Sequence, residues 1–127
     1  MSRLTSRRLA AGITAAVLAL SLLWLGGWAA YAHAHLQRSE PRDGSTVIPA
    51  PNQVALWFTE SLEPALSGVE VRDAQGSRVD QGEPQISGAT MRIGLKALPP
   101  GTYKVNWHVL SVDTHKTHGT FSFQVGQ

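Results

Sequence analysis

Residues that could do chemistry gather in a short polar stretch near the C-terminus, between Ser111 and Gly119. Within it, Asp113 and His115 stand at positions i and i+2, and in an extended chain such side chains leave by the same face. The flanking segments, 103–109 and 120–125, alternate apolar and polar residues, which predicts half-buried strands. Asp113 and His115 are therefore candidate ligands of a metal ion on a loop held by two strands, and a third ligand must come from elsewhere.

The N-terminus has the pattern of a secretory signal peptide over residues 1–32. Three arginines precede an uncharged, Leu- and Ala-rich run from Leu9 to Ala32, and small residues at its end resemble a cleavage site. Cleavage after Ala32 leaves a mature domain of residues 33–127, although cleavage after Ala34 fits the same rule. An uncleaved anchor is the alternative, since the run is long enough to span a bilayer. The pair Arg7-Arg8 leaves both the general secretory and the twin-arginine export routes open.

A histidine at the start of the mature chain can act as a chelating ligand. The α-amine and Nδ1 of His33 can bind one metal ion together, and a second imidazole completes a T-shaped array of nitrogens that suits Cu(II). His115 is the candidate for that imidazole, and Asp113 adds an oxygen donor that favours Cu(II) over Cu(I). His35 offers an alternative site, in which copper binds the α-amine, two deprotonated amides and the His35 imidazole.

The signal peptide holds much of the positive charge of the chain. It has three of the 11 Lys and Arg residues and none of the 9 Asp and Glu, which leaves 8 basic against 9 acidic residues in the mature part. We therefore expect no binding to nucleic acid. The chain contains no cysteine, so the exported domain must be stable without disulfides and offers no thiolate to a metal.

The mature part consists of short extended segments separated by turn residues, and no segment predicts a helix. The segments cover 33–38, 54–59, 69–72, 78–80, 91–95, 103–109 and 120–125, and Asp73-Ala74-Gln75-Gly76 predicts a hairpin turn between two of them. About seven such strands indicate an all-β fold, an antiparallel sandwich or Greek-key barrel. We expect the core to contain Leu56, Trp57, Phe58, Val69, Val71, Ile93, Tyr103, Val105, Trp107, Val109, Phe121, Phe123 and Val125.

Several stretches together carry a family resemblance. They are His33-Ala34-His35-Leu36 after a signal, Ser39-Glu40-Pro41, Asp43-Gly44-Ser45, 56–60, 100–107, and Ser111-Val112-Asp113-Thr114-His115 with Gly119 and 121–125. In these stretches the chain resembles the CopC family of periplasmic copper-binding proteins of bacterial copper resistance and uptake. The resemblance implies a cupredoxin- or immunoglobulin-like Greek-key β-barrel with one Cu(II) ion bound by His33, Asp113 and His115.

The resemblance also bears on partners and on metal selectivity. It implies a periplasmic or otherwise extracytoplasmic protein whose partner is a membrane copper importer of the CopD type, and we expect a monomer. Some members carry a Met-rich Cu(I) site, but past Met1 this chain has only Met91, so we expect binding of Cu(II) alone. Thr114 stands where many members have glycine, which we expect to matter little for the ligands.

Two other functions compete with copper binding and delivery. One is a copper-dependent oxidative enzyme that uses the same N-terminal histidine chelate, and the other is a sandwich domain that binds no metal. Asp113 would occupy a position that oxygen chemistry needs open, so we interpret the protein as a binding protein and not as an enzyme. His118 could assist the site from nearby, although a solvated histidine is the simpler interpretation, and His108 is expected at the surface.

Overall fold

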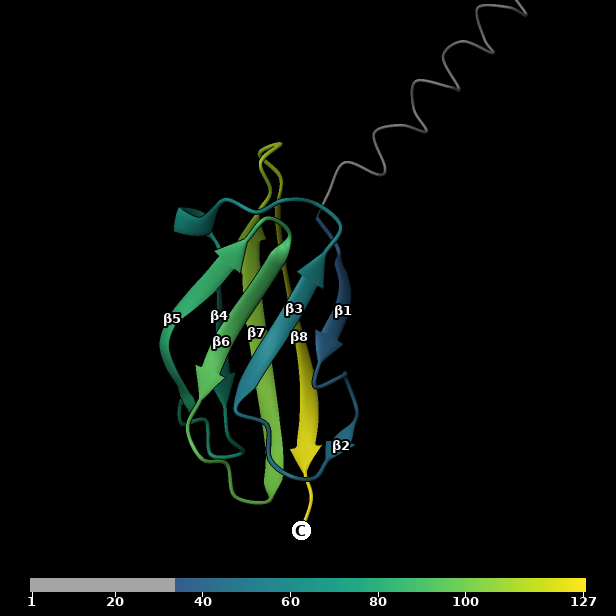
Figure 1. Ribbon diagram of the computed structural model, residues 1–127, viewed down its shortest axis with the longest axis vertical. Coiled ribbons are helices and arrows are strands. Elements are labelled where there is room, and N and C mark those ends of the chain that lie inside the picture. The colour runs from purple at the N-terminus through teal and green to yellow at the C-terminus, as the bar shows by residue number, and fades with distance from the viewer. Residues whose placement is uncertain (1–33) are drawn as a thin grey trace, which may run out of the picture. The chain divides into compact units, whose positions relative to one another are not determined.

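The computed structural model describes residues 34–127, so the predicted signal peptide, its cleavage sites and His33 lie outside the described residues. The described chain forms two four-stranded sheets packed face to face (Figure 1). The strands are β1 (Leu36–Glu40), β2 (Thr46–Val47), β3 (Gln53–Phe58), β4 (Gly68–Arg72), β5 (Asp80–Ser87), β6 (Thr90–Leu95), β7 (Gly101–Leu110) and β8 (Lys116–Val125), with one 3₁₀ turn, η2 (Pro64–Leu66). None of the helical structure within residues 34–127 is long and apolar enough to cross a membrane.

The strand order is β1-β3-β6-β5 in one sheet and β2-β8-β7-β4 in the other. Every pairing between these strands is antiparallel except the short one between β2 and β8. Strands β3, β6, β5 and β4 follow one another around one side of the sandwich, which is the Greek-key order. The all-β, two-sheet architecture predicted from the sequence is therefore confirmed.

The longest hairpin of the fold positions the candidate metal ligands. β7 and β8 pair without interruption from Gly101↔Val125 to Leu110↔Lys116, and the loop 111–115 closes this ladder. Figure 1 shows the loop at the same end of the sandwich as the start of β1. A loop at the end of a fully paired ladder has little freedom to change its geometry, so its side chains are presented in fixed positions.

The core between the sheets contains the inward-facing residues of the alternating strands, as predicted. All predicted core residues other than the two tryptophans are buried, and Ala34, Val54, Leu62, Met91, Leu95 and Leu98 join them. Trp107 is half-buried and packs against this cluster, with its ring edge-on to Phe58 at 5.1 Å between centroids. Gly119 faces Trp107 across the ladder, and a Cβ there would lie 2.5 Å from Trp107 Cζ2, so only glycine leaves room for the ring.

The prediction that Trp57 belongs to the core is wrong. Leu56 and Phe58 point into the sandwich, so Trp57 between them lies on the outer face of its sheet, half-buried. Arg38 from β1 lies 4.0 Å from the centre of the Trp57 ring, and Arg92 from β6 lies 5.4 Å from it. Two guanidinium groups therefore cover the Trp57 ring on the outer face of the sheet, by cation–π contact.

The strand predictions also differ from the structure elsewhere, since β2 and most of β5 were not predicted as strands. The Asp73–Gly76 turn forms, but the chain returning from it pairs with β4 only at the bridge Arg72↔Arg78 and then crosses to the other sheet as β5. Residues 116–119, which we expected in the loop before the last strand, belong to β8. The loop that carries the candidate ligands is thus shorter and more firmly held than the sequence indicates.

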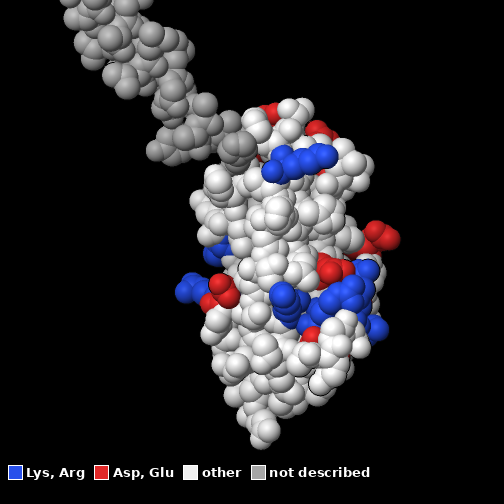
Figure 2. Space-filling model, turned by 180° about the vertical axis from the view of Figure 1, so that it is seen from behind, with Lys and Arg blue, Asp and Glu red and all other residues white. Residues whose placement is uncertain are grey.

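Asp80 is a buried carboxylate that joins the two sheets. Its side chain is 4% exposed, its Oδ2 accepts the Val71 N–H at 2.7 Å, and its Oδ1 accepts Arg78 Nη2 at 2.8 Å. Figure 2 shows acidic and basic side chains gathered over β4 and the connection that follows it, where Glu70 also pairs with Arg72. Within this group, Asp80 is buried between the sheets and accepts a hydrogen bond from the backbone of Val71.

We expect Asp80→Ala to lower the free energy of unfolding by about 2 kcal/mol, because it leaves the buried Val71 N–H without its acceptor. Urea denaturation measures the change. Glu83→Ala removes an exposed carboxylate from the same strand and serves as the control, with an expected effect within about 0.5 kcal/mol. Equal losses in the two variants would contradict the structural role assigned to Asp80.

Candidate metal centre

The loop 111–115 is tied down on both of its sides. Inside the loop, Ser111 N donates to His115 O at 3.0 Å and Thr114 N donates to Ser111 O at 2.9 Å. On the outside, Val112 N donates to Ser61 O at 3.0 Å, and Ser111 forms a bridge with Leu62 in the connection after β3. The backbone of the candidate ligands is therefore held by hydrogen bonds from two parts of the chain.

Thr114 adopts a left-handed backbone conformation between the two candidate ligands. Its φ is +73°, a region that a β-branched residue rarely enters and that glycine enters freely. The Thr114 hydroxyl donates to Asp113 O at 2.5 Å. The loop thus stores local backbone strain at the turn that brings Asp113 and His115 together.

Asp113 and His115 lie side by side, although a turn at Thr114, and not the extended chain expected from their spacing, brings them together. Asp113 Oδ1 is 3.4 Å from His115 Nδ1, and the two side chains are 37% and 41% exposed. Ser111, which is fully buried, donates its hydroxyl to Asp113 Oδ1. This hydrogen bond is the main reason why the pKa of the Asp113 carboxyl lies below its ordinary value. Burial opposes the lowering, and contacts with His115 add to it. The pair is an ionised carboxylate and an imidazole, each partly exposed, although His115 Nδ1 itself is buried.

We expect Ser111→Ala to raise the pKa of Asp113, because the largest cause of its lowering is the Ser111 hydroxyl. A carboxyl whose pKa is lowered in the folded protein stabilises the fold above its unfolded pKa, and this contribution is lost as the pH falls through the folded pKa. Carboxyl carbon shifts followed by NMR against pH measure the titration of Asp113. Ser45→Ala, which removes a hydroxyl bonded to Arg42 O in another loop, should leave that titration unchanged.

The chain that enters β1 lies against the start of β8, next to the loop that carries this pair. Thr117 Oγ1 donates to Ala34 O at 2.8 Å, although the two residues are 83 positions apart, and Ala34 is fully buried. His35 pairs with Thr59, which follows β3: His35 N donates to Thr59 Oγ1 at 2.9 Å, and Thr59 N donates to His35 O at 3.0 Å. The first described residue, Ala34, is thus bonded to Thr117, which follows His115 by two residues.

Sequence reasoning did not identify the three hydroxyls that hold this region. For the Ser111 hydroxyl the sequence offered one signal, its position two residues before Asp113. Thr59 and Thr117 gave no such indication, since their partners are 24 and 83 positions away.

Two further histidines, His108 and His118, lie on the outer face of the sheet that carries the loop. His118 is exposed on β8 with the opposite orientation to Thr117, and it stands opposite His108 of β7 on the outer face of the sheet. The His108 ring lies over Gly68, where a Cβ would come within 2.8 Å of it. Residues 34–127 contain no group of three or more His, Cys, Asp or Glu side chains that could hold a metal ion.

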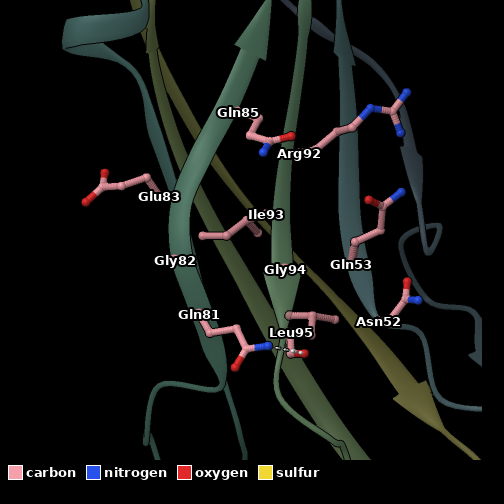
Figure 3. A pocket seen from close by; sticks show the side chains of 10 residues that line it. All are labelled: Asn52, Gln53, Gln81, Gly82, Glu83, Gln85, Arg92, Ile93, Gly94 and Leu95. Carbon is pink, nitrogen blue, oxygen red and sulfur yellow. Dashed lines mark hydrogen bonds between the residues drawn. The ribbon is translucent and has the colours of Figure 1, made fainter.

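A groove of about 550 Å³ lies on the outer face of the other sheet and is separate from the candidate ligands. Figure 3 shows the side chains of β5, β6 and the start of β3 around it, with Gln81 Nε2 donating to Leu95 O. Carboxamides and one arginine dominate its lining, and neither Asp113 nor His115 takes part. Its chemistry is that of a solvated polar surface, not of a metal site.

Comparison with known proteins identifies the family of this domain. The sequence profile described as the CopC domain matches residues 36–126. The chain belongs to the CopC family. The two-sheet fold and the recognition of the family from sequence are therefore confirmed. The matched range includes Asp113 and His115 and begins after His33.

Members of the CopC family similar to this chain include proteins named for copper. Copper resistance protein C of Xanthomonas campestris pv. juglandis is 36% identical over 110 residues, which cover 80% of this chain and 86% of that protein. Copper transport protein CutJ of Bacillus subtilis is 32% identical over 101 residues, which cover 76% of this chain and 19% of that protein. The crystal structure of PcoC, a methionine-rich copper resistance protein from Escherichia coli, superposes with a TM-score of 0.65 at 34% identity, over 74% of this chain and 99% of that one.

Proposed function

We propose that this protein binds one Cu(II) ion outside the cytoplasm through His33, Asp113 and His115 and delivers it to a membrane copper importer. The observation that carries the proposal is the pairing of an ionised carboxylate with an imidazole, 3.4 Å apart and partly exposed, on a loop held before any metal arrives. Preorganised ligands lose little freedom on binding, which favours tight coordination. The CopC relatives named for copper resistance and copper transport agree with this metal.

The chemistry of the donors fits Cu(II) better than Cu(I). Imidazole nitrogen and carboxylate oxygen suit Cu(II), whereas Cu(I) prefers sulfur. Met91 is the one methionine among residues 34–127, and it is fully buried on β6 in the core. PcoC is described as methionine-rich. Residues 34–127 of this chain, with a single methionine, cannot form a cluster of thioether ligands.

The third ligand of the proposal is the first residue of the mature chain. His33 directly precedes Ala34, whose carbonyl is held by Thr117 two residues along β8 from His115. Cleavage of the signal peptide after Ala32 would create a free α-amine next to the His33 imidazole, and the two would chelate the ion together. Without cleavage at this bond the amine would be an amide, which would remove the chelate.

A membrane copper importer of the CopD type is the proposed recipient. The similarity to CutJ supports it, because this chain matches only 19% of that protein, so a related domain occurs within a much larger copper transport protein. Val112, beside Asp113 in the loop, is 53% exposed and offers an apolar contact at the proposed metal site. A recipient that docks there would meet the ligands directly.

Intact mass and competition titration of the exported protein test the proposal. We expect a chain that begins at His33, gains the mass of one copper, competes with Cu(II) chelators and leaves Cu(I) with a Cu(I) chelator. A retained signal peptide or a start at His35 would contradict the chelate. Tight Cu(I) binding would contradict the selectivity, and oxidation of a glycan by ascorbate and oxygen would indicate an enzyme instead.

A further inference from the structure

One peptide group at the start of the described chain is held between the two sheets. Its carbonyl, Ala34 O, accepts the Thr117 hydroxyl of β8 at 2.8 Å, and its N–H, on His35, donates to the Thr59 hydroxyl after β3 at 2.9 Å. The His35 carbonyl adds a bond from Thr59 N at 3.0 Å. Both polar ends of the Ala34–His35 peptide are thus bonded to threonine hydroxyls from opposite layers of the sandwich. We call this arrangement the threonine clamp.

A chain that starts His-Ala-His can bind copper in two ways that exclude each other. One uses the α-amine and imidazole of His33 with Asp113 and His115. The other uses the same α-amine with the amide nitrogens of Ala34 and His35 and the His35 imidazole, four nitrogens in the plane that Cu(II) prefers. In that case each amide nitrogen forms a bond to copper as its hydrogen leaves to solvent as a proton. Because the α-amine is shared, one ion can occupy only one of the two sites.

The threonine clamp obstructs the four-nitrogen site. A metal bound to His35 N would stand where the amide hydrogen is, at about 2 Å from the nitrogen. The Thr59 hydroxyl already lies in that direction, 2.9 Å from the same nitrogen. The ion and the oxygen could not both fit there, so the peptide would have to leave Thr59. Thr117 opposes this rotation, because it holds the carbonyl end of the same rigid peptide plane.

We propose that Thr59 and Thr117 determine which of the two copper sites forms. They keep the nitrogen of the Ala34–His35 peptide away from copper and leave the α-amine to the site of His33, Asp113 and His115. This inference rests on the proposed function, because it assumes a mature chain that begins at His33. The threonines are positioning residues that hold backbone and do not touch the metal.

The test compares Thr59→Val, Thr117→Val and the double variant with the unaltered protein, all starting at His33 and loaded with one equivalent of Cu(II). Valine keeps the branched shape and removes the hydroxyl. Each lost hydrogen bond should shift the balance between the sites roughly 2- to 10-fold, and the two losses together by more. Electron paramagnetic resonance and visible absorption should therefore change from a mixed nitrogen–oxygen spectrum to a four-nitrogen spectrum, with larger parallel hyperfine splitting and a band at shorter wavelength. Adding His35→Ala to the double variant should abolish the new spectrum.

Thr120→Val is the matched control, since it removes a hydroxyl from the same strand that bonds to Asn106 Oδ1 at 2.8 Å, away from the clamp. Its spectrum should remain that of the unaltered protein. Thr59→Ser and Thr117→Ser, which restore a hydroxyl, should return the original spectrum. If the double variant does not fold, the single variants decide: a four-nitrogen fraction that depends on His35 supports the proposal, and its absence overturns it.

The outcomes separate failure of the clamp from failure of the metal site. If the folded double variant keeps the original spectrum and that spectrum still depends on His115, the clamp is overturned and the proposed function stands. If the unaltered protein already gives a four-nitrogen spectrum that depends on His35, both are overturned. A spectrum that depends on His115 before the threonines are changed and on His35 afterwards supports both.

Discussion

Replacing His115 by alanine should weaken Cu(II) binding by about 10²-fold or more. Loss of groups that only support a ligand already reduces metal affinity roughly 10- to 100-fold, and His115 is a proposed ligand itself. Its imidazole stands 3.4 Å from the Asp113 carboxylate on a loop bonded to two parts of the chain, so no other histidine of the described chain can take its place without rebuilding the loop. Competition against a Cu(II) chelator and electron paramagnetic resonance measure the loss.

Two variants make this measurement specific. His118→Ala removes an exposed imidazole three residues further along the chain, on the outer face of β8, and should leave affinity and spectrum unchanged. Asp113→Asn keeps the shape and an oxygen that can accept the Ser111 hydroxyl but removes the negative charge. It should weaken binding less than the loss of His115 does. An unaltered copper spectrum in the His115 variant would rule out the proposed site.

One extra residue before His33 should weaken Cu(II) binding at least as much as His115→Ala. The addition converts the α-amine to an amide and moves the free amine away from the His33 imidazole, so the chelate is lost while every side chain remains. The same two measurements apply. One extra residue after Gln127 is the control, because it adds the same mass at the other end of the chain and should be silent.

Combining the N-terminal extension with His115→Ala tests whether both act at one site. Groups that bind the same ion are coupled, so the double change should cost much less than the product of the two separate losses. Independent effects that multiply would mean that the amine and His115 serve different ions. In that case the single-site proposal would be incorrect, whatever each change does alone.

The fold followed from the sequence wherever a strand faces the core on one side. The alternation in 103–109 and 120–125 places Tyr103, Val105, Phe121 and Phe123 inside, and the structure buries all of them. β5 was missed because it borders its sheet and has few inward positions, so its sequence Asp-Gln-Gly-Glu-Pro-Gln-Ile-Ser shows no apolar alternation. Trp57 was misplaced because it stands in a continuous apolar run, in which no alternation shows which side chains face the core. The arginines that contact its ring come from two other strands, so local sequence does not reveal them either.

The candidate metal centre could be predicted only as far as local spacing reaches. Asp113 and His115 lie together as expected, but the expected reason is wrong, because residues 112–114 form a turn with Thr114 at a φ of +73° and not an extended segment. The support from Thr59 and Thr117 depends on how the two sheets stack, and no local pattern encodes contacts across 24 and 83 positions. The left-handed backbone of Thr114 could not be predicted from the sequence, because threonine rarely adopts this conformation. Once observed, it explains why glycine suits that position.

The irregular course of β5 bears on how this domain behaves when many copies accumulate. Its register with β6 shifts between Gln81 and Gln85, Gly82 has a φ of +78°, and Pro84 has no N–H to donate. Exposed Glu83 adds a charge in the middle of this stretch. A border strand interrupted in this way cannot serve as a template for a strand from a second molecule, which is how unprotected sheets start to aggregate. The irregular backbone of β5 therefore disfavours edge-to-edge association of the domain through this strand.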